Sequence, residues 1–298
     1  MVDKGKILNE PRYICFMNPQ QILSDFLKST SEFMTSREAT QTFYILLEDL
    51  WDVSKGDFLF GKVDWTLPKK KQLQEAIVLL SNNTPVQHIT GKAFFYDSLF
   101  SISKDTLVPR PETEELVALI LKTQPVGPQK GLDIGTGSGC IPITLSKNRT
   151  YWTMEGIDVS AEALQMARKN AAQLGVDVQW ILADILTTAP PVEAYDFIVS
   201  NPPYIPSTEV DTLNENVLNF DPRIALEVPD DDPLQFYKCI VQYAHKALVS
   251  GGGLYLEIHE NYGLQTLSLL QDEKWRGAKI IVDLSGKNRM IYAQKALD

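Results

Sequence analysis

Apolar residues recur with two different spacings along this chain. Before residue 85 they recur at helical spacing, as at Phe43, Leu46, Leu47 and Leu50, which predicts amphipathic helices. After residue 131, short apolar runs at 132–134, 154–157, 178–182, 197–199 and 254–258 predict strands, while 141–145, 160–174, 233–248 and 264–270 predict helices. A closing strand pair is expected at 279–284 and 290–293. This alternation predicts an α/β fold with a doubly wound, mostly parallel sheet.

Helix-start signals organise the first part of the chain. Asn18 followed by Pro19 is typical of an N-cap and the first helical position. Thr35 and Glu38 have the spacing of a capping box, and Pro68 opens a further helix. We therefore predict a small helical domain over residues 18–84. Residues 1–17 have no hydrophobic periodicity, and we expect them to form a flexible tail.

The segment 85–108 has a different composition. Its aromatic and β-branched runs, 93–96 and 99–102, are separated by Asp97 and Ser98, which predicts a β-hairpin linker. The ligand-binding domain is then expected to span residues 109–298.

Composition and charge limit the possible functions. No apolar run approaches the roughly 18 residues that would cross a membrane, and the first 20 residues show no export or organelle signal. Cys15, Cys140 and Cys239 are too scattered for a disulfide framework or a zinc site, so we expect no metal and a cytoplasmic location. The net charge of −10 argues against direct nucleic-acid binding.

A glycine-rich loop follows the first predicted strand of the sheet. It reads Asp133-Ile134-Gly135-Thr136-Gly137-Ser138-Gly139 and precedes a predicted helix. Glycines at such a position allow a ligand to approach the backbone and expose N–H groups at a helix start. The loop predicts a nucleotide-type ligand.

Acidic residues end the next two predicted strands. Asp158 lies 23 residues after Gly135, where a carboxylate can accept hydrogen bonds from ribose hydroxyls. Asp184, which precedes Ile185, is placed to accept from an adenine amino group. All these positions lie at the carboxyl ends of strands, where open α/β sheets bind ligands.

The fourth predicted strand ends in Asn201-Pro202-Pro203-Tyr204. The two prolines hold the backbone extended and donate no hydrogen bonds, which makes a stiff shelf at the strand tip. The Asn201 side-chain oxygen and the Pro202 carbonyl can accept both hydrogens of a planar NH2 group, and Tyr204 can cover its face. Asn201, Pro202 and Tyr204 are therefore the candidate catalytic residues.

Two classes of ligand fit the loop and the acids, a dinucleotide or S-adenosylmethionine. The spacing G-x-G-x-G departs from the dinucleotide pattern G-x-G-x-x-G, and a dehydrogenase gives no reason for the shelf. A methyl donor does, because a methyl acceptor with a planar NH2 group must be held beside its sulfonium.

The motifs together resemble the HemK/PrmC family of glutamine-N5 methyltransferases, which modify class 1 peptide-chain release factors. The matching stretches are PVQHITGKAFFY (85–96), PRPETEELV (109–117), LDIGTGSGCI (132–141), GIDVSAEAL (156–164), VSNPPYIP (199–206), DPRIALE (221–227) and SGGGLYLEI (250–258). Many members carry a glycine pair where this chain has residues 227–230, and a glycine where it has His259.

The resemblance implies a class I S-adenosylmethionine-dependent methyltransferase, with a seven-stranded Rossmann-like sheet behind a helical domain. It implies a donor bound by Asp133, Gly135, Thr136, Gly137, Ser138, Gly139, Asp158, Asp184, Ile185 and Asn201. It also implies a substrate glutamine held by Asn201, Pro202, Pro203 and Tyr204, with Arg110 presented rigidly between Pro109 and Pro111.

Three alternatives remain at this point. An adenine-N6 methyltransferase on DNA or RNA uses the same kind of shelf but needs a flipped base and a basic track. A glutamine methyltransferase that acts on a ribosomal protein is harder to distinguish from the motifs. A non-catalytic dinucleotide-binding protein would leave the shelf unexplained.

Overall fold

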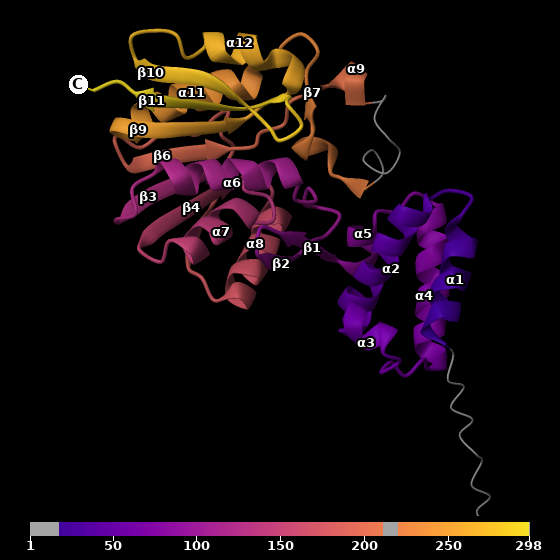
Figure 1. The fold of residues 1–298 in the computed structure, drawn as a ribbon. Helices are drawn as coiled ribbons and strands as arrows, with labels where there is room; N and C mark the ends of the chain where they lie inside the picture. The colour runs from indigo at the N-terminus through magenta and orange to yellow at the C-terminus, as the bar shows by residue number, and fades with distance from the viewer. Residues whose placement is uncertain (1–17, 211–219, 298) are drawn as a thin grey trace, which may run out of the picture. The chain divides into compact units, whose positions relative to one another are not determined.

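The computed structural model describes residues 18–210 and 220–297 (Figure 1). The expected flexible tail, residues 1–17, lies outside this range. Contacts divide the chain into two compact units, one ending at Thr90 and the other beginning at Gly91. We refer to them as the helical unit and the sheet unit.

Within residues 18–90, the helical unit contains five helices. These are α1 (Pro19–Thr30), α2 (Ser36–Trp51), α3 (Lys55–Leu59), α4 (Leu67–Ser81) and α5 (Val86–Thr90). The predicted starts at Asn18 and Thr35 are confirmed, since Asn18 Oδ1 accepts from Gln20 N at 3.0 Å and Thr35 Oγ1 accepts from Glu38 N at 3.2 Å. The helix expected to open at Pro68 begins one residue earlier, at Leu67. The helix α5 lies in the range expected to be linker, because Thr84-Pro85 starts a further short turn of helix before the hairpin.

Three phenylalanines form the centre of the helical unit. Phe26, Phe43 and Phe58 are almost completely buried, and the ring centroid of Phe43 lies 5.1 Å from each of the other two. Burial of large aromatic side chains of this kind dominates the energetics of a small core. The unit therefore owes its stability mainly to apolar packing.

The sheet unit begins with the predicted hairpin, which is confirmed. Strands β1 (Lys92–Phe95) and β2 (Ser98–Ser101) pair antiparallel across Tyr96 and Asp97. The Asn170 side chain of α8 bonds both backbone groups of Ser101 at 2.8 and 2.9 Å, which attaches the hairpin to the sheet unit.

The main sheet is seven-stranded in the order β10-β11-β9-β6-β3-β4-β5. Its strands are β3 (Gln129–Ile134), β4 (Trp152–Asp158), β5 (Val178–Leu182), β6 (Tyr195–Ser200), β9 (Leu248–Glu257), β10 (Trp275–Val282) and β11 (Asn288–Lys295). The pairings among β5, β4, β3, β6 and β9 are parallel, while β11 pairs antiparallel with β9 and β10. The predicted doubly wound, mostly parallel sheet is therefore confirmed.

Helices cover both faces of the sheet (Figure 1). One face packs against α6 (Pro111–Thr123), α7 (Cys140–Asn148) and α8 (Ala161–Leu174), and the other packs against α11 (Gln235–Ala247) and α12 (Gly263–Ser268). The helix expected from residue 233 begins two residues later at Gln235, because Asp232 O accepts from Gln235 N in a turn that contains Pro233.

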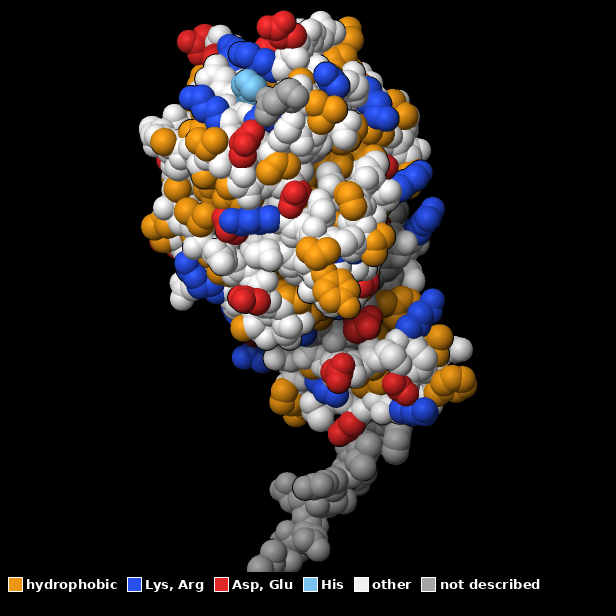
Figure 2. Space-filling view, turned by 90° about the vertical axis from the view of Figure 1, so that its left-hand side faces the viewer, with side chains coloured by type: hydrophobic (Ala, Val, Ile, Leu, Met, Phe, Trp, Pro, Cys, Tyr) orange, Lys and Arg blue, Asp and Glu red, His pale blue; other side chains and the backbone are white. Residues whose placement is uncertain are grey.

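Small elements complete the unit beside the end of β6. The strands β7 (Ile205–Pro206) and β8 (Glu227–Val228) pair in parallel, flanked by α9 (Ser207–Val210), η1 (Arg223–Ala225) and η2 (Glu260–Tyr262). Among residues 18–210 and 220–297, no helix is both long enough and apolar enough to cross a membrane. On the face in Figure 2, basic and acidic side chains are interspersed among apolar ones rather than gathered in a basic track.

Candidate active site

A cavity of about 320 Å³ lies at the carboxyl edge of the sheet. The ends of β3, β4, β5 and β6 supply much of its wall, as the position of ligand sites in open α/β sheets predicts. Eight of the residues predicted from sequence line it, namely Gly135, Gly137, Asp158, Asp184, Ile185, Asn201, Pro202 and Pro203. We call this space the edge cavity.

The glycine-rich loop reaches the edge cavity, but its N–H groups do not behave as expected. Gly135 N and Thr136 N both donate to Ile157 O, at 2.9 and 3.0 Å, and Gly137 N donates to Asp158 Oδ2 at 2.8 Å. The expectation of free N–H donors is therefore wrong for these three positions. Because these three N–H groups bond to the end of β4, the loop contributes to the cavity by letting a ligand come close to its backbone.

The glycines of the loop lie in different surroundings. All have positive φ, but a Cβ on Gly137 would meet no atom within 4 Å, whereas one on Gly139 would lie 2.8 Å from the Trp180 ring. Gly139 thus allows α7 to pack, and it caps that helix. Ser138 also has an internal role, since its carbonyl accepts from Asn170 Nδ2 at 2.9 Å.

Asp158 is held in a fixed orientation by two backbone donors. Its Oδ2 accepts from Gly137 N at 2.8 Å and its Oδ1 accepts from Ser160 N at 2.9 Å. Each carboxylate oxygen keeps a further lone pair. The geometry therefore leaves a bidentate acceptor at the cavity wall, suited to the two hydroxyls of a ribose.

Asp184 and Ile185 form the wall after β5. Asp184 Oδ1 accepts from Leu186 N at 2.9 Å, which fixes the turn, and Ile185 supplies an apolar surface that is itself 9% exposed. Such an arrangement suits the edge and face of a purine.

Asp133 lies behind the loop and is completely buried. Within the described residues, neither of its carboxylate oxygens nor Thr136 Oγ1 has a hydrogen-bond partner. Burial raises the pKa of Asp133 to about 7, and the Asp158 charge adds to the increase. The nearby Thr136 hydroxyl opposes this increase, although it does not meet the geometric criteria of a hydrogen bond. Unpaired buried acceptors are costly, so these atoms fit a cationic or donor group of a bound ligand.

The shelf after β6 lies in the cavity wall through Asn201, Pro202 and Pro203. Tyr204 does not line the cavity. Its backbone N donates to Leu226 O at 3.2 Å, and its ring packs edge-on against His259 with centroids 5.8 Å apart. Burial raises the pKa of Tyr204 above its usual range, so this phenol stays neutral.

Arg110 is fixed by an acidic partner. Its Nη2 pairs with Asp221 Oδ2 at 2.5 Å, and Asp221 Oδ1 accepts from Val108 N at 3.2 Å. Asp221 thus attaches the Arg110 segment to the stretch DPRIALE. Arg110 is half-exposed and lies outside the cavity lining.

The Asn201 side chain contacts a buried pair that no sequence argument had assigned. Asn201 Nδ2 donates to Thr113 Oγ1 at 3.3 Å, and Thr113 Oγ1 donates to Glu257 Oε2 at 2.7 Å. Burial raises the pKa of Glu257 to about 7, while Thr113 and the neighbouring arginines oppose the increase.

Sequence reasoning also missed the apolar wall of the edge cavity. Leu107, Ile224, Phe236 and Ile240 contribute to it. Single apolar residues carry no individual signal, but two of the four lie in or beside motifs already recognised, PRPETEELV and DPRIALE.

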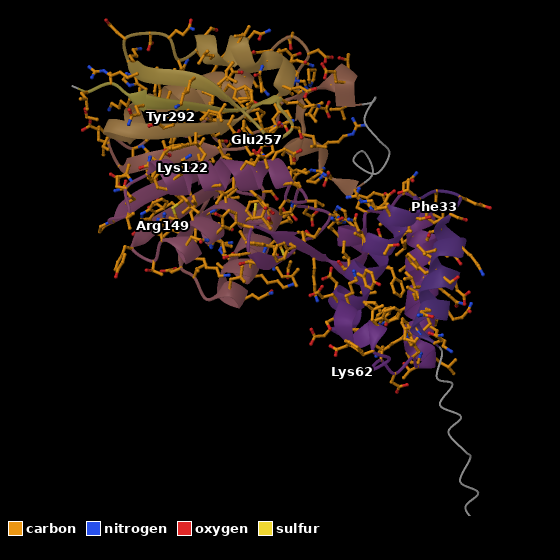
Figure 3. All side chains as sticks on the ribbon, in the orientation of Figure 1. Phe33, Lys62, Lys122, Arg149, Glu257 and Tyr292 are labelled. Atoms are coloured by element: carbon orange, nitrogen blue, oxygen red, sulfur yellow. The ribbon has the colours of Figure 1, made fainter. Side chains whose placement is uncertain are left out.

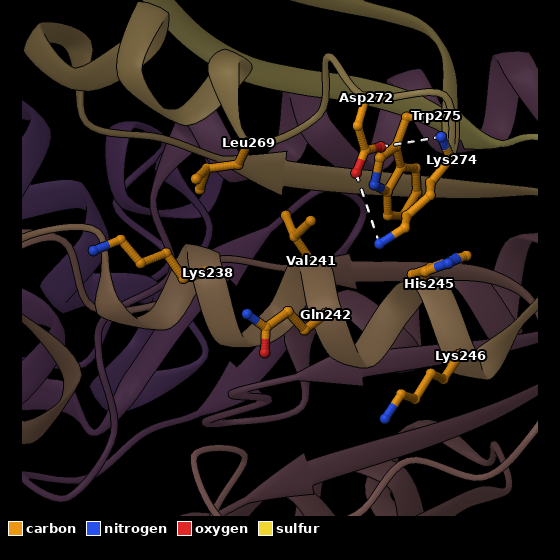
Figure 4. Close-up of a pocket in the computed structure, with 9 residues that line it drawn as sticks. All are labelled: Lys238, Val241, Gln242, His245, Lys246, Leu269, Asp272, Lys274 and Trp275. Atoms are coloured by element: carbon orange, nitrogen blue, oxygen red, sulfur yellow. Dashed lines mark hydrogen bonds and ion pairs between the residues drawn. The ribbon is translucent and has the colours of Figure 1, made fainter.

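A second cavity of about 440 Å³ lies elsewhere, between α11 and the segment that leads into β10 (Figure 4). Two of its lysines are paired, Lys238 Nζ with Asp232 at 2.7 Å and Lys274 Nζ with Asp272 at 3.9 Å. None of the sequence-predicted site residues lines it. The candidate site is therefore the smaller edge cavity.

Comparison with known proteins gives a consistent result. A family model described as "Methyltransferase small domain" matches residues 113–219. The release factor glutamine methyltransferase of Bacteroides thetaiotaomicron is 37% identical over 271 residues, covering 90% of this chain and 97% of its own. That of Flavobacterium psychrophilum is 38% identical over 274 residues, covering 90% and 96%. A methyltransferase structure from Pyrococcus furiosus has a TM-score of 0.50 at 17% identity, covering 75% of this chain and 99% of its own.

The sheet order, the edge cavity and these similarities show that the fold is that of the class I, S-adenosylmethionine-dependent methyltransferases. Within that class, the chain belongs to the release factor glutamine methyltransferase family.

Proposed function

We propose that this protein transfers a methyl group from S-adenosylmethionine to the side-chain amide nitrogen of a glutamine in a class 1 peptide-chain release factor. The observation that carries the proposal is that Asn201, Pro202 and Pro203 line the same cavity as Gly137 and Asp158. An amide-binding shelf and a nucleoside-binding carboxylate thus lie on one small space. The names of the family's relatives supply the glutamine and the release factor.

The fit to the donor comes from the chain's own residues. Asp158 would accept from the ribose, Asp184 and Ile185 would contact the adenine, and Asp133 with Thr136 would meet the polar end of the methionine part. When bound, S-adenosylmethionine supplies a methyl group activated by its sulfonium.

The shelf would position the amide nitrogen and accept its hydrogens. An amide nitrogen is a poor nucleophile, so its aim and its environment matter most. Positioning of two reactants in a productive geometry can supply about 7–11 kcal/mol of the barrier reduction. The Asn201 oxygen and the Pro202 carbonyl would accept the two amide hydrogens as positive charge develops on nitrogen. The amide nitrogen loses one proton to solvent after it has gained the methyl group, and the donor is left as a neutral thioether, so no nucleophilic side chain and no general base are assigned.

We further propose roles outside the cavity. The helical domain, residues 18–84, would recognise the body of the release factor, and the linker over 85–108 would join it to the catalytic domain. Tyr204 and Arg110 would contact the substrate rather than the donor. The protein would act in the cytoplasm, where release factors work, and would not bind nucleic acid directly.

The test is methyl transfer from labelled S-adenosylmethionine to three separate acceptors: a purified class 1 release factor, ribosomal proteins and unmethylated DNA. We expect label on one glutamine of the release factor, identified by mass spectrometry of its peptides. Label only on a ribosomal protein would mean that the substrate is a ribosomal protein and not a release factor. Label on adenine would overturn the assignment of glutamine as the acceptor. A release factor with that glutamine replaced by glutamate is the matched control and should accept no label.

A further inference from the structure

A buried network extends from the end of β9 to the shelf. We propose that Thr113 and Glu257 are positioning residues that fix the orientation of the Asn201 amide, so that its oxygen faces the substrate nitrogen. The proposal rests on the proposed function, because it deepens the role of the shelf as an amide-binding site.

Three elements bring the network together. Thr113 lies in the first turn of α6, Glu257 is the last residue of β9, and Asn201 directly follows β6. Strands β6 and β9 pair in parallel with Ser200 opposite Leu256, so their carboxyl ends lie side by side. Figure 3 marks Glu257 where β9 ends beside α6. Thr113 is 2% exposed and Glu257 1% exposed, so water does not compete for these contacts.

The direction of the hydrogen bonds determines the orientation of the amide. A threonine hydroxyl has one proton, and Thr113 donates it to Glu257 Oε2 at 2.7 Å. Its oxygen can then only accept, so the group of Asn201 that faces it at 3.3 Å must be the NH2. Reversal of the amide would place two oxygens against each other. The Asn201 oxygen is therefore left for the cavity that this residue lines.

This orientation has a consequence for substrate choice. Two acceptors, the Asn201 oxygen and the Pro202 carbonyl, match the two hydrogens of a glutamine NH2 group. A glutamate carboxylate has no hydrogen to donate and would meet both acceptors with like partial charge. A reversed Asn201 would present a donor and lose this discrimination.

The network also predicts a dependence on the charge of Glu257. A protonated Glu257 would donate to Thr113, which would release the threonine hydroxyl to donate to the Asn201 oxygen and reverse the amide. Burial places the pKa of Glu257 at about 7, within reach of this change. Among the described residues, several ionisable groups interact electrostatically with Glu257. The charged ones are Arg110 and Glu112 at the start of α6 and Arg289 of β11. The others are Tyr204, Tyr237 of α11 and Cys140 of α7. The tyrosines and the cysteine have raised pKa values and stay neutral near pH 7.

The test compares Thr113→Val with Thr113→Ser. Valine keeps the shape without a hydroxyl, whereas serine keeps the hydroxyl. In single-turnover transfer to a glutamine peptide at saturating donor, Thr113→Val should be slower by about tenfold or more, the effect of one lost buried hydrogen bond and a misaimed amide. Thr113→Ser should stay within about threefold of wild type. Donor affinity by calorimetry should be the same in all three proteins.

The pH profile gives a readout that a merely structural role would not change. The wild-type rate should rise with pH to a plateau above about 7, and this rise should be absent in Thr113→Val. A Thr113→Val enzyme with the wild-type rate and the same rise of the rate with pH would overturn the proposal.

A second measurement does not depend on the substrate. The Asn201 side-chain NH2 signals in a ¹⁵N NMR spectrum can be assigned by their loss in Asn201→Ala. They should shift with pH near 7 in wild type and Thr113→Ser, but not in Thr113→Val. If wild type labels no glutamine, the proposed function fails, while these signals alone decide whether the network orients Asn201. Identical titration in Thr113→Val would overturn it.

Discussion

The helical unit and the carboxyl edge of the main sheet are built on opposite physical principles. The helical unit buries aromatic rings such as Phe26, Phe43 and Phe58, and its helix starts are capped by side chains. The edge buries carboxyl groups instead, and burial raises the pKa of both Asp133 and Glu257 to about 7. One region is arranged for stability, whereas the other holds buried carboxyl groups that cost stability.

Among the changes that test this contrast, Phe43→Ala should have the largest effect, a loss of stability in the helical unit. Phe43 contacts two other rings at 5.1 Å and is completely buried, so its truncation should cost about 3–5 kcal/mol in the helical unit. Urea unfolding should detect the loss. Phe33→Ala, at a side chain that is 36% exposed, is the control and should change little. Donor binding at the edge should persist in both, and its loss in Phe43→Ala would argue that the two regions unfold together.

Asn201→Ala should affect the edge alone. It removes the acceptor for one amide hydrogen and the aim of the nitrogen, so single-turnover methyl transfer should fall by about a hundredfold or more. Donor affinity should fall only modestly, and the unfolding midpoint should hardly move. Retention of more than about a tenth of the wild-type rate, a loss under about 1.4 kcal/mol, would mean that the shelf is not the amide-binding site.

Glu257→Gln should reveal how much stability the buried carboxylate costs. Glu257 binds a proton more tightly in the folded state, since its pKa rises from 4.5 to about 7. Its contribution to stability is thus full below pH 4.5 and lost as the pH rises through about 7. The glutamine variant should be more stable than wild type at pH 8, by about 3 kcal/mol, with the difference closing as the pH falls to 4.5.

A neighbouring carboxylate provides the control for that experiment. Lys287 lowers the pKa of Glu260, so its stabilising contribution is present at neutral pH and is lost as the pH falls. Glu260→Gln should therefore give a pH dependence of opposite sign. The same sign in both variants would show that the pH trend does not arise from Glu257.

Asp158→Ala tests whether the edge also binds the nucleoside. It removes an acceptor that two backbone N–H groups already hold in place. Donor affinity should fall at least about tenfold, because charge-assisted hydrogen bonds contribute roughly 1.5–3 kcal/mol each. Calorimetry measures this directly, with circular dichroism to confirm the fold. Unchanged affinity would remove Asp158 from the donor site.

The two regions also differ in what could be predicted from sequence. Alternating apolar runs predicted the sheet, and residues at strand ends, such as Asp158 and Asn201, could be placed at one edge because parallel strands end together. The Thr113–Glu257 contact joins residues 144 apart, and neither residue type signals it. Likewise, the hydrogen bonds from the loop N–H groups to Ile157 and Asp158 depend on how the loop lies against the end of β4, which no local pattern encodes.

The smallest expected effect concerns the capping of the helical unit. Thr35 and Thr66 are both N-cap residues in extended conformation, but only Thr35 makes the side-chain hydrogen bond, with Oγ1 accepting from Glu38 N at 3.2 Å. Thr35→Ala leaves that N–H without a partner from the cap and should cost about 1 kcal/mol, whereas Thr66→Ala should cost much less. Urea midpoints of the two variants provide the comparison. Equal losses would mean that the cost arises from the alanine backbone preference rather than from the cap bond, and that the start of α2 is held by packing alone.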